Sequence, residues 1–463
     1  MGTPVKVTVI GAGSVVFSLA LVKDICLTDG LAGSHITFMD IHEGRLNAIY
    51  NLATRFGEDL GSDLTFSKTL NRQEALQDAD FVVNTATVTD EYMMRAEREL
   101  ADARGYHYGR TGLPYSMTGN IQLMLSIAQD MERICPDAWI IQAGNPVFDG
   151  TTAVTRETGI KMVGLCHGHY GYLGIARTLG LDPAKITWQA PGLNHNIWLT
   201  DFFYEGQDAY PLIDKWIEEE AEKYWAETQE TEAGIPTQMS PSAIHQYKMY
   251  GLMPIGDTPR RGGWWYHVDA ETRIRWYGKP IGGGDTPVGR DRIIDGKEKK
   301  FADITKAAFD EKVRPVDLFG KEKSREQHVP IIDALVNNNE GQFQVNVRNE
   351  GALPGMPDDV AVEVPAVVNI KGIQPLRVPP LPTKVMLEQI LPNWLSIEST
   401  IEALLTGDRS MLLFNVLQSH QTRSYDQAVE VMEALMDLED KEATDAMRLM
   451  QSTREKFQFP KPL

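Results

Sequence analysis

A cysteine and several histidines occupy two turns of the chain where side chains could bind a metal ion. Cys166, His167 and His169 follow a short apolar segment, and Asn194 precedes His195 in the second turn. A thiolate and an imidazole together can hold manganese, iron, cobalt or zinc, because the metal itself stabilises the thiolate. A lone cysteine is more often a small buried apolar residue, and the histidines could equally be structural. Residue types alone leave both interpretations open.

A third cluster combines an acid, arginines and aromatic rings. Asp257, Arg260 and Arg261 are followed by two tryptophans, Tyr266 and His267, in a stretch without helix or strand periodicity. This composition would suit a sugar-binding loop. A solvated turn beside a packed aromatic cluster has the same composition, so both readings stay open.

Asn145 lies directly after the apolar segment 139–142 and is followed by proline. If that segment is a strand of a parallel sheet, its carboxyl end faces the crevice where doubly wound sheets bind ligands. An Asn-Pro pair is also an ordinary turn, and the turn is the simpler explanation when Asn145 is considered alone.

The first turn of the chain has the composition of a dinucleotide-binding turn. Gly11 permits a tight turn, and Gly13, before Ser14, lets a pyrophosphate approach the backbone at a helix N-terminus. Val16 occupies the third small position of the usual fingerprint, so the pattern is incomplete. Asp40 follows the next apolar segment, where a carboxylate would hold a ribose 2′-hydroxyl and favour NAD over NADP. We predict an NAD site, with a glycine turn in a non-binding sheet as the alternative.

These turns must be positioned by the elements around them, and the first half of the chain alternates strand and helix patterns. Near-continuous apolar runs indicate parallel strands that are covered on both faces. Met124, Ile127 and Met131 have the spacing of an amphipathic helix between two such runs. The predicted strands are 5–10, 36–39, 81–85, 139–142 and 162–166. We therefore expect an α/β fold with a Rossmann-like, doubly wound parallel sheet.

The second half of the chain has a mixed pattern. Residues 343–347 and 360–364 are typical of a strand pair, and a helical pattern follows a proline-rich stretch. We predict an NAD-binding domain over residues 1–190. A second, mixed α+β domain for catalysis, substrate binding and oligomerisation is predicted over residues 191–463.

The composition argues against certain partners and indicates a cellular compartment. The chain has 463 residues, a formal net charge of −19 and three cysteines, Cys26, Cys135 and Cys166. So acidic a chain is a poor candidate for nucleic acid or an anionic membrane, since either would require a basic face. Three cysteines are too few for a disulfide scaffold and favour a reducing compartment. The apolar stretch 7–22 is too short for a membrane span, so we expect a soluble, cytoplasmic protein.

Taken together, the motifs resemble family 4 of the glycoside hydrolases, the NAD-dependent and metal-dependent group. The resemblance covers most of the chain, with the motifs in the same order. It implies that Cys166 and His195 are ligands of a metal, usually manganese, and that Asn145 and Asn194 contact the sugar. The implied partner is a small-molecule α-glycoside, and relatives are commonly homodimers or homotetramers.

The resemblance also implies a reaction. The sugar would be oxidised transiently at C3 with NAD, and the C2 proton would be removed. The aglycone would then leave by elimination, and water would add at C1. The cation would stabilise the enolate as a Lewis acid, and the hydride would finally return to C3. Asp257 matches the position proposed as base in some α-specific members, and Tyr266 is an alternative base. His167 matches a candidate general acid.

Two departures from the family pattern concern the substrate. Residues 166–168 are Cys-His-Gly. The Cys-His pair argues against the phosphoglycosidase branch, which has Cys-Asn, and Gly168 is closer to the uronidase branch than to the α-glucosidases and α-galactosidases. Residues 109–111 are Gly-Arg-Thr, where many relatives have Gln-Glu-Thr. Arg110, Arg260 and Arg261 are therefore candidates for binding a substrate carboxylate, unless they neutralise local acids. We expect an α-galacturonidase or α-glucuronidase.

Three alternatives remain. An α-glucosidase or α-galactosidase of the same family would act on a neutral hexoside. A sugar-acid or hydroxy-acid dehydrogenase on the same fold would accumulate NADH. A non-catalytic NAD-binding regulator would keep its function after a Cys166→Ser substitution.

Overall fold

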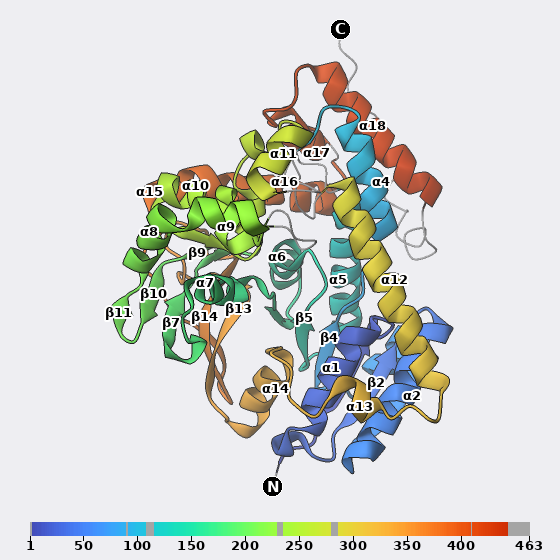
Figure 1. Ribbon diagram of the computed structural model, residues 1–463. Helices are drawn as coiled ribbons and strands as arrows, with labels where there is room; N and C mark the ends of the chain where they lie inside the picture. Colours follow the sequence, from blue (N-terminus) through green and yellow to red (C-terminus); the bar gives the residue numbers. More distant parts are fainter. Residues whose placement is uncertain are drawn as a thin grey trace.

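A twelve-stranded mixed sheet forms the centre of the described part of the chain (Figure 1). The computed structural model describes residues 2–88, 91–107, 115–228, 235–278, 286–408 and 410–442. The strand order is β12-β9-β8-β14-β13-β6-β5-β4-β1-β2-β3, with β15 beside β14. One half of this sheet is parallel and the other half is antiparallel.

The parallel half contains the strands that the apolar runs predict. Five of them match their predicted ranges within two residues, because each is a short apolar segment with buried side chains. The pattern does not predict β3, an edge strand whose side chains are exposed or only partly buried. In spatial order the strands are β3 (Thr65–Thr69), β2 (His35–Met39), β1 (Lys6–Ile10), β4 (Phe81–Asn84), β5 (Trp139–Gln142) and β6 (Lys161–Gly164).

Successive residues of these strands face two different helical layers, because side chains alternate across a sheet. Val7 and Val9 of β1 pack in one cluster with α1 and α2, and Ile10 packs in another with α5. Burying a valine fully contributes about 1.5–3 kcal/mol. The helices are α1 (Val15–Cys26), α2 (Glu43–Leu60) and α5 (Tyr115–Ile134). The doubly wound, Rossmann-like architecture is confirmed.

The antiparallel half continues the same sheet. Asn346 of β13 lies opposite Gly164 of β6, and β13 pairs along its length with β14, which confirms the predicted strand pair. The strands are β13 (Gly341–Arg348), β14 (Ala361–Asn369), β8 (Gly192–Leu193), β9 (Asn196–Leu199), β12 (Met253–Ile255) and β15 (Gly372–Pro375). The sheet therefore contains strands from both sides of residue 190. The division into two domains at that residue stays a prediction.

Helices and a small second sheet surround this centre. In Figure 1, α12 runs along α2 and α4, and α18 lies beside α4. No helix among the described residues is both long and apolar enough to span a bilayer. The second sheet has the order β11-β10-β7. Its strands are β7 (Ile186–Gln189), β10 (Asp201–Tyr204) and β11 (Gln207–Asp208). The remaining helices are α3 (Arg72–Leu76), α4 (Glu91–Asp102), α6 (Val147–Glu157), α7 (Gly171–Leu179), α8 (Tyr210–Glu219), α9 (Ala221–Thr228), α10 (Pro241–Tyr250), α11 (Ala270–Tyr277), α12 (Pro287–Phe309), α13 (Pro315–Phe319), α14 (His328–Asn337), α15 (Thr383–Val385), α16 (Leu391–Thr406), α17 (Ser410–Leu417) and α18 (Tyr425–Glu442).

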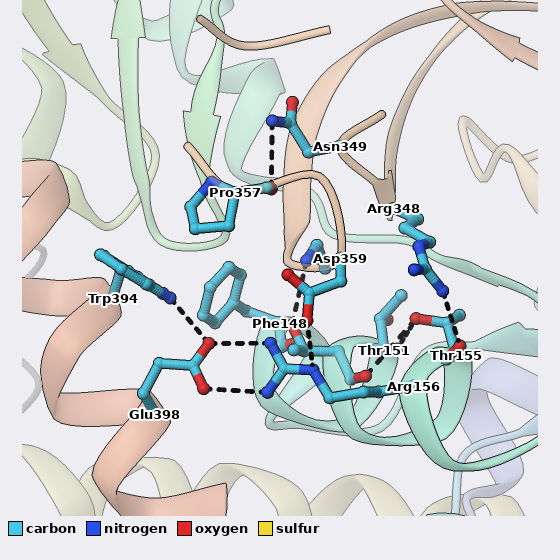
Figure 2. Close-up of polar contacts among 12 residues, drawn as sticks. Phe148, Thr151, Thr155, Arg156, Arg348, Asn349, Pro357, Asp359, Trp394 and Glu398 are labelled. Carbon is cyan, nitrogen blue, oxygen red and sulfur yellow. Dashed lines mark hydrogen bonds and ion pairs between the residues drawn. The ribbon is translucent and has the colours of Figure 1, made fainter. Parts of the chain in front are cut away.

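An ionic clamp connects α16 to α6 and to the turn between β13 and β14 (Figure 2). Arg156 donates two hydrogen bonds of 2.9 Å to Glu398, and its Nε lies 2.9 Å from Asp359 Oδ2. Trp394 Nε1 donates to the same glutamate at 2.7 Å. A bidentate arginine–carboxylate pair fixes the orientation of both side chains. The clamp therefore fixes the first half of α16 relative to α6.

Candidate active site

The turn after β1 is packed so closely that glycine is required at two positions. Gly11 has φ = 81°, and a Cβ there would lie 2.5 Å from the backbone nitrogen of Ala86. A Cβ on Gly13 would lie 2.7 Å from Asp40 Oδ2, which accepts a 2.7 Å hydrogen bond from Gly13 N–H. Asp40 Oδ1 accepts a second bond of 2.8 Å from His42 N–H. Asp40 thus holds the glycine turn at the carboxyl end of β2.

The N-terminus of α1 begins directly after this turn. Ser14 is its N-cap residue, and in the described structure the serine side chain makes no capping hydrogen bond. The first turn of α1 also contains no acidic residue. The first N–H groups of a helix have no partner within the helix, and together with the helix dipole they attract anions. The turn and helix therefore fit the pyrophosphate of a dinucleotide.

Cys166 lies in the turn after β6, at the edge of the sheet where the carboxyl ends of the parallel strands meet. Burial raises the pKa of its thiol to about 12, and the charge of Glu363 acts in the same direction. Hydrogen bonds from Gly168 and Asn194 lower the pKa, but by less. The thiol on its own is therefore protonated at neutral pH, and a bound cation would stabilise the thiolate that ligates it.

Two glycines bring the Cys166 turn against the loop that carries Asp257. Gly256 has φ = 64°, and a Cβ on it would lie only 2.6 Å from Gly168 Cα. A Cβ at position 168 would in turn lie 3.9 Å from Cys166 Sγ. Gln238 Nε2 donates to the carbonyl of Gly256 at 2.8 Å, which fixes the contact further. Backbone here lies against backbone, with no side chain between the two turns.

Asp257 connects this loop to the His195 turn between β8 and β9. Its Oδ2 lies 3.6 Å from His195 Nε2, and its Oδ1 pairs with Arg260. Burial alone would raise the pKa of the Asp257 carboxyl, but His195, Arg260 and Arg261 together lower it. The carboxylate is ionised at neutral pH and can accept a proton. Arg260 neutralises a local acid, which is the alternative that the sequence leaves open for it.

Asn194 is held by a carboxyl group that the sequence motifs do not single out. Its Nδ2 donates to Oε2 of Glu363 at 3.0 Å, and Asn346 Nδ2 donates to the same oxygen at 3.3 Å. Glu363 is 1% exposed, and its Oε1 has no hydrogen-bond partner within the described residues. Burial raises the pKa of this carboxyl to about 7. A charged residue inside the apolar run 360–364 is the signal that could have indicated it.

The two histidines after Cys166 lie in different environments. His167 has a side chain that is 64% exposed, and its Nε2 donates to Glu326 Oε2 at 2.6 Å, which raises the histidine pKa. His169 is buried, its ring centroid lies 4.0 Å from that of Tyr170, and burial lowers its pKa to about 4. His169 is therefore a structural histidine, whereas His167 can hold a proton.

Two further predicted site residues have partners outside this group. Tyr266 is fully buried, and its hydroxyl is hydrogen-bonded to His245 Nδ1 at 2.7 Å. Asn145 is exposed beyond the end of β5, and its carbonyl accepts a 3.0 Å bond from Asn120 Nδ2. Arg110 lies outside the described residues.

The structure thus brings Cys166, Asn194, His195 and Asp257 together at one edge of the sheet. A thiolate with an imidazole is a donor set that fits manganese, iron, cobalt or zinc. Across the described ranges, no three His, Cys, Asp or Glu side chains are arranged as a complete metal site. Catalytic metal sites keep positions open for water or substrate, so two protein ligands are compatible with that use.

Most of the chain matches the models of a known protein family. Residues 6–180 match the family 4 glycosyl hydrolase model, and residues 190–422 match the model of the C-terminal domain of that family. The chain therefore belongs to family 4 of the glycosyl hydrolases, as its motifs predict.

The relatives of the chain have several sugar specificities. An α-galactosidase of Bacillus subtilis (strain 168) is 27% identical, over 81% of this chain and 84% of its own length. An α-galacturonidase of Lachnoclostridium phytofermentans is 25% identical, over 88% of this chain and 90% of its own. The structure of a 6-phospho-α-glucosidase from gut microorganisms, in complex with NAD and Mn²⁺, has a TM-score of 0.74 at 19% identity. The structural match covers 95% of this chain and 98% of the phosphoglucosidase chain, and it shows that the two share a fold.

Proposed function

We propose that this glycoside hydrolase is an α-glycosidase for uronic acid glycosides, an α-galacturonidase or α-glucuronidase that uses NAD and manganese. The convergence of Cys166, Asn194, His195 and Asp257 carries the proposal. These residues lie at the sheet edge where the glycine turn after β1 also lies. Family 4 membership supports the reaction, and the complex of a neighbouring structure with NAD and Mn²⁺ supports the cofactors.

The dinucleotide would lie on the glycine turn. Gly11 and Gly13 keep the backbone clear of side chains, and the uncapped N–H groups after Ser14 would hold the pyrophosphate. Asp40 is already fixed by two backbone donors, and each of its oxygens can accept a further bond from a ribose hydroxyl.

Cys166 and His195 would hold the cation. When bound, the dinucleotide supplies a hydride acceptor for C3 and the cation supplies a Lewis acid at the C2 and C3 oxygens. Asn194, oriented by Glu363, and Asn145 would bind sugar hydroxyls.

Asp257 would remove the C2 proton. Its carboxylate is ionised, partly exposed and adjacent to His195. Tyr266 is a weaker candidate, because its hydroxyl is buried and already bonded to His245. His167, which Glu326 keeps oriented, would protonate the leaving group.

The substrate carboxylate would bind to arginine. The positive charge of Arg261 acts to lower the pKa of both Asp257 and Asp149, the latter in the first turn of α6, so it lies close enough to act on both carboxyl groups. Arg260 supports this role less, because it pairs with Asp257. Arg110 stays a candidate from the sequence.

The test is a panel of nitrophenyl α-galacturonide, α-glucuronide, α-glucoside and α-galactoside, each with and without NAD and Mn²⁺. We expect hydrolysis of the uronides only with both cofactors, without NADH accumulation, and with C2 deuterium exchanged for solvent hydrogen. Deuterium retained in the product would exclude C2 proton removal, and stoichiometric NADH would indicate a dehydrogenase.

The same panel tests the role of Arg261. Arg261→Ala should lower kcat/KM at least tenfold more for the uronides than for the neutral sugars, because it removes a two-pronged carboxylate contact. Arg260→Ala should lower the rates for all substrates alike, since Arg260 orients Asp257. Equal losses in the Arg261 variant would remove the carboxylate role.

The second candidate is a neutral α-hexosidase. It is favoured by the α-galactosidase relative, whose identity of 27% is similar to the 25% of the α-galacturonidase. Hydrolysis of the galactoside alone would favour this candidate.

We also propose that the protein is cytoplasmic and forms a homodimer or homotetramer. Light scattering of the purified enzyme measures the oligomeric state.

A further inference from the structure

A π-helical turn, Met386–Ile390, lies between α15 and α16 and contacts two segments of the candidate site. Such turns are rare and are frequently found at functional sites. Pro392, in the first turn of α16, has no N–H to donate to the carbonyl of Glu388 four residues earlier. This interruption of the hydrogen-bond ladder accounts for the wider turn.

The side chain of Gln389 in this turn holds the loop that carries Asp257. Gln389 is 3% exposed, and its Nε2 donates to the carbonyl of Gly262 at 2.8 Å and to the Tyr250 hydroxyl at 2.8 Å. Gly262 is itself confined, because a Cβ on it would lie 2.1 Å from Gln246 Cδ. The buried amide therefore fixes the backbone next to Arg261.

The main-chain carbonyl of Gln389 holds the second segment. It accepts a 2.8 Å hydrogen bond from Asn196 Nδ2, and Asn196 directly follows His195. Asn196 is fully buried, and its Oδ1 accepts a 3.0 Å bond from Trp198 Nε1. The Asn196 side chain is therefore fixed at both ends.

We propose that Gln389 is a positioning residue that sets the placement of Asp257 relative to His195. One residue anchors both segments, the first through its amide and the second through its carbonyl. The inference rests on the proposed roles of Asp257 and His195, whose Oδ2 and Nε2 atoms are 3.6 Å apart. A misplacement of about 1 Å between reacting groups can lower a rate about 100-fold.

Gln389→Leu tests the first link, because leucine has a similar volume and no donor. We expect kcat for the preferred glycoside to fall about 100-fold with KM changed far less, because misplacement affects the reacting groups more than binding. Hydrogen exchange of the segment 257–263 should become faster. If the leucine variant does not fold, Gln389→Met supplies the same loss with an unbranched side chain.

Asn196→Leu tests the second link, and the double variant tests whether the two links share one function. If both fix the same geometry, the double variant should be scarcely slower than either single variant. If the rate loss of the double variant equals the product of the two single losses, the two links act independently and the idea of one common anchor is wrong. Wild-type kcat and unchanged exchange in the Gln389 variants would overturn the positioning role.

Asn349→Leu is the matched control. Asn349 is fully buried in the turn between β13 and β14, and its Nδ2 donates to the carbonyls of Leu353, Met356 and Pro357. Figure 2 shows the bond to Pro357. Its loss should lower Tm while kcat and exchange of 257–263 stay at wild-type values. If the wild-type enzyme shows no hydrolysis that depends on NAD and Mn²⁺, the proposed function is wrong. Hydrogen exchange of the segment 257–263 would still test whether Gln389 anchors the loop.

Discussion

Glu363 carries a carboxyl group in the interior of the sheet, where it is hydrogen-bonded by the amides of Asn194, Asn346 and Gln344. Burial raises the pKa of this carboxyl from 4.5 to about 7. The folded state therefore binds the proton more tightly than the unfolded state does. The resulting contribution to stability is complete below pH 4.5 and is lost as the pH rises through about 7.

Glu363→Gln should remove this part of the pH dependence, because glutamine stays uncharged and keeps an oxygen for Asn194. Between pH 4.5 and pH 8 the wild-type protein should lose roughly 3 kcal/mol more stability than the variant, at about 1.4 kcal/mol per pKa unit. Urea unfolding in EDTA at several pH values measures the difference. Parallel profiles for the two proteins would contradict a buried, titrating Glu363.

Sequence patterns indicate the candidate site residues better than the partners of those residues. Cys166, His195 and Asp257 stand out by type, and all three lie at the candidate site. Glu326, bonded to His167 across 159 positions, and Glu363, bonded to Asn194 across 169, are brought in by the fold. No local spacing encodes such contacts. Residue type also cannot separate the buried His169 from the exposed His167.

Among the elements, the contact between the turns of Gly168 and Gly256 decides how the two halves of the candidate site meet. Gly256 has a left-handed backbone. It also lies so close to Gly168 that there is no room for a Cβ on Gly256. The contact therefore depends on both backbone conformation and space.

Gly256→Ala should push the two turns apart. We expect a loss of about 1–2 kcal/mol from the left-handed backbone and a rate loss of tenfold or more from the displaced Asp257. Gly61→Ala separates the two effects, because Gly61 has φ = 65° and nothing within 4 Å of an added Cβ. Thermal unfolding and kcat are measured for both. Equal rates in the two variants would show that the turn contact does not position Asp257.

Element prediction succeeds where burial dominates. The strands β1, β2, β4, β5 and β6 are apolar because both faces of the sheet are covered. The edge strand β3 lacks that signal, since its sequence Thr-Phe-Ser-Lys-Thr is held by pairing with β2. The π-helical turn has a local cause in Pro392, but the contacts that Gln389 makes from this turn, to Gly262 and to Asn196, join segments far apart in the sequence and follow no local pattern.

For the whole molecule, the pairing of β6 with β13 matters most. It places strands from both sides of residue 190 in one hydrogen-bonded sheet. A fragment of residues 1–190 should therefore expose the β6 edge and aggregate, whereas the full chain should not. Size-exclusion chromatography of both proteins tests this. A monomeric, folded fragment would show that the first 190 residues form an independent unit.

The same pairing has a consequence for synthesis on the ribosome. The parallel strands end at Gly164, but their neighbour β13 begins only at Gly341. The nascent chain therefore carries the unpaired edge of β6 while the intervening residues are translated, at about 5–20 residues per second. For roughly ten seconds or more the nascent protein would depend on chaperones or on transient local packing to keep that edge from other chains.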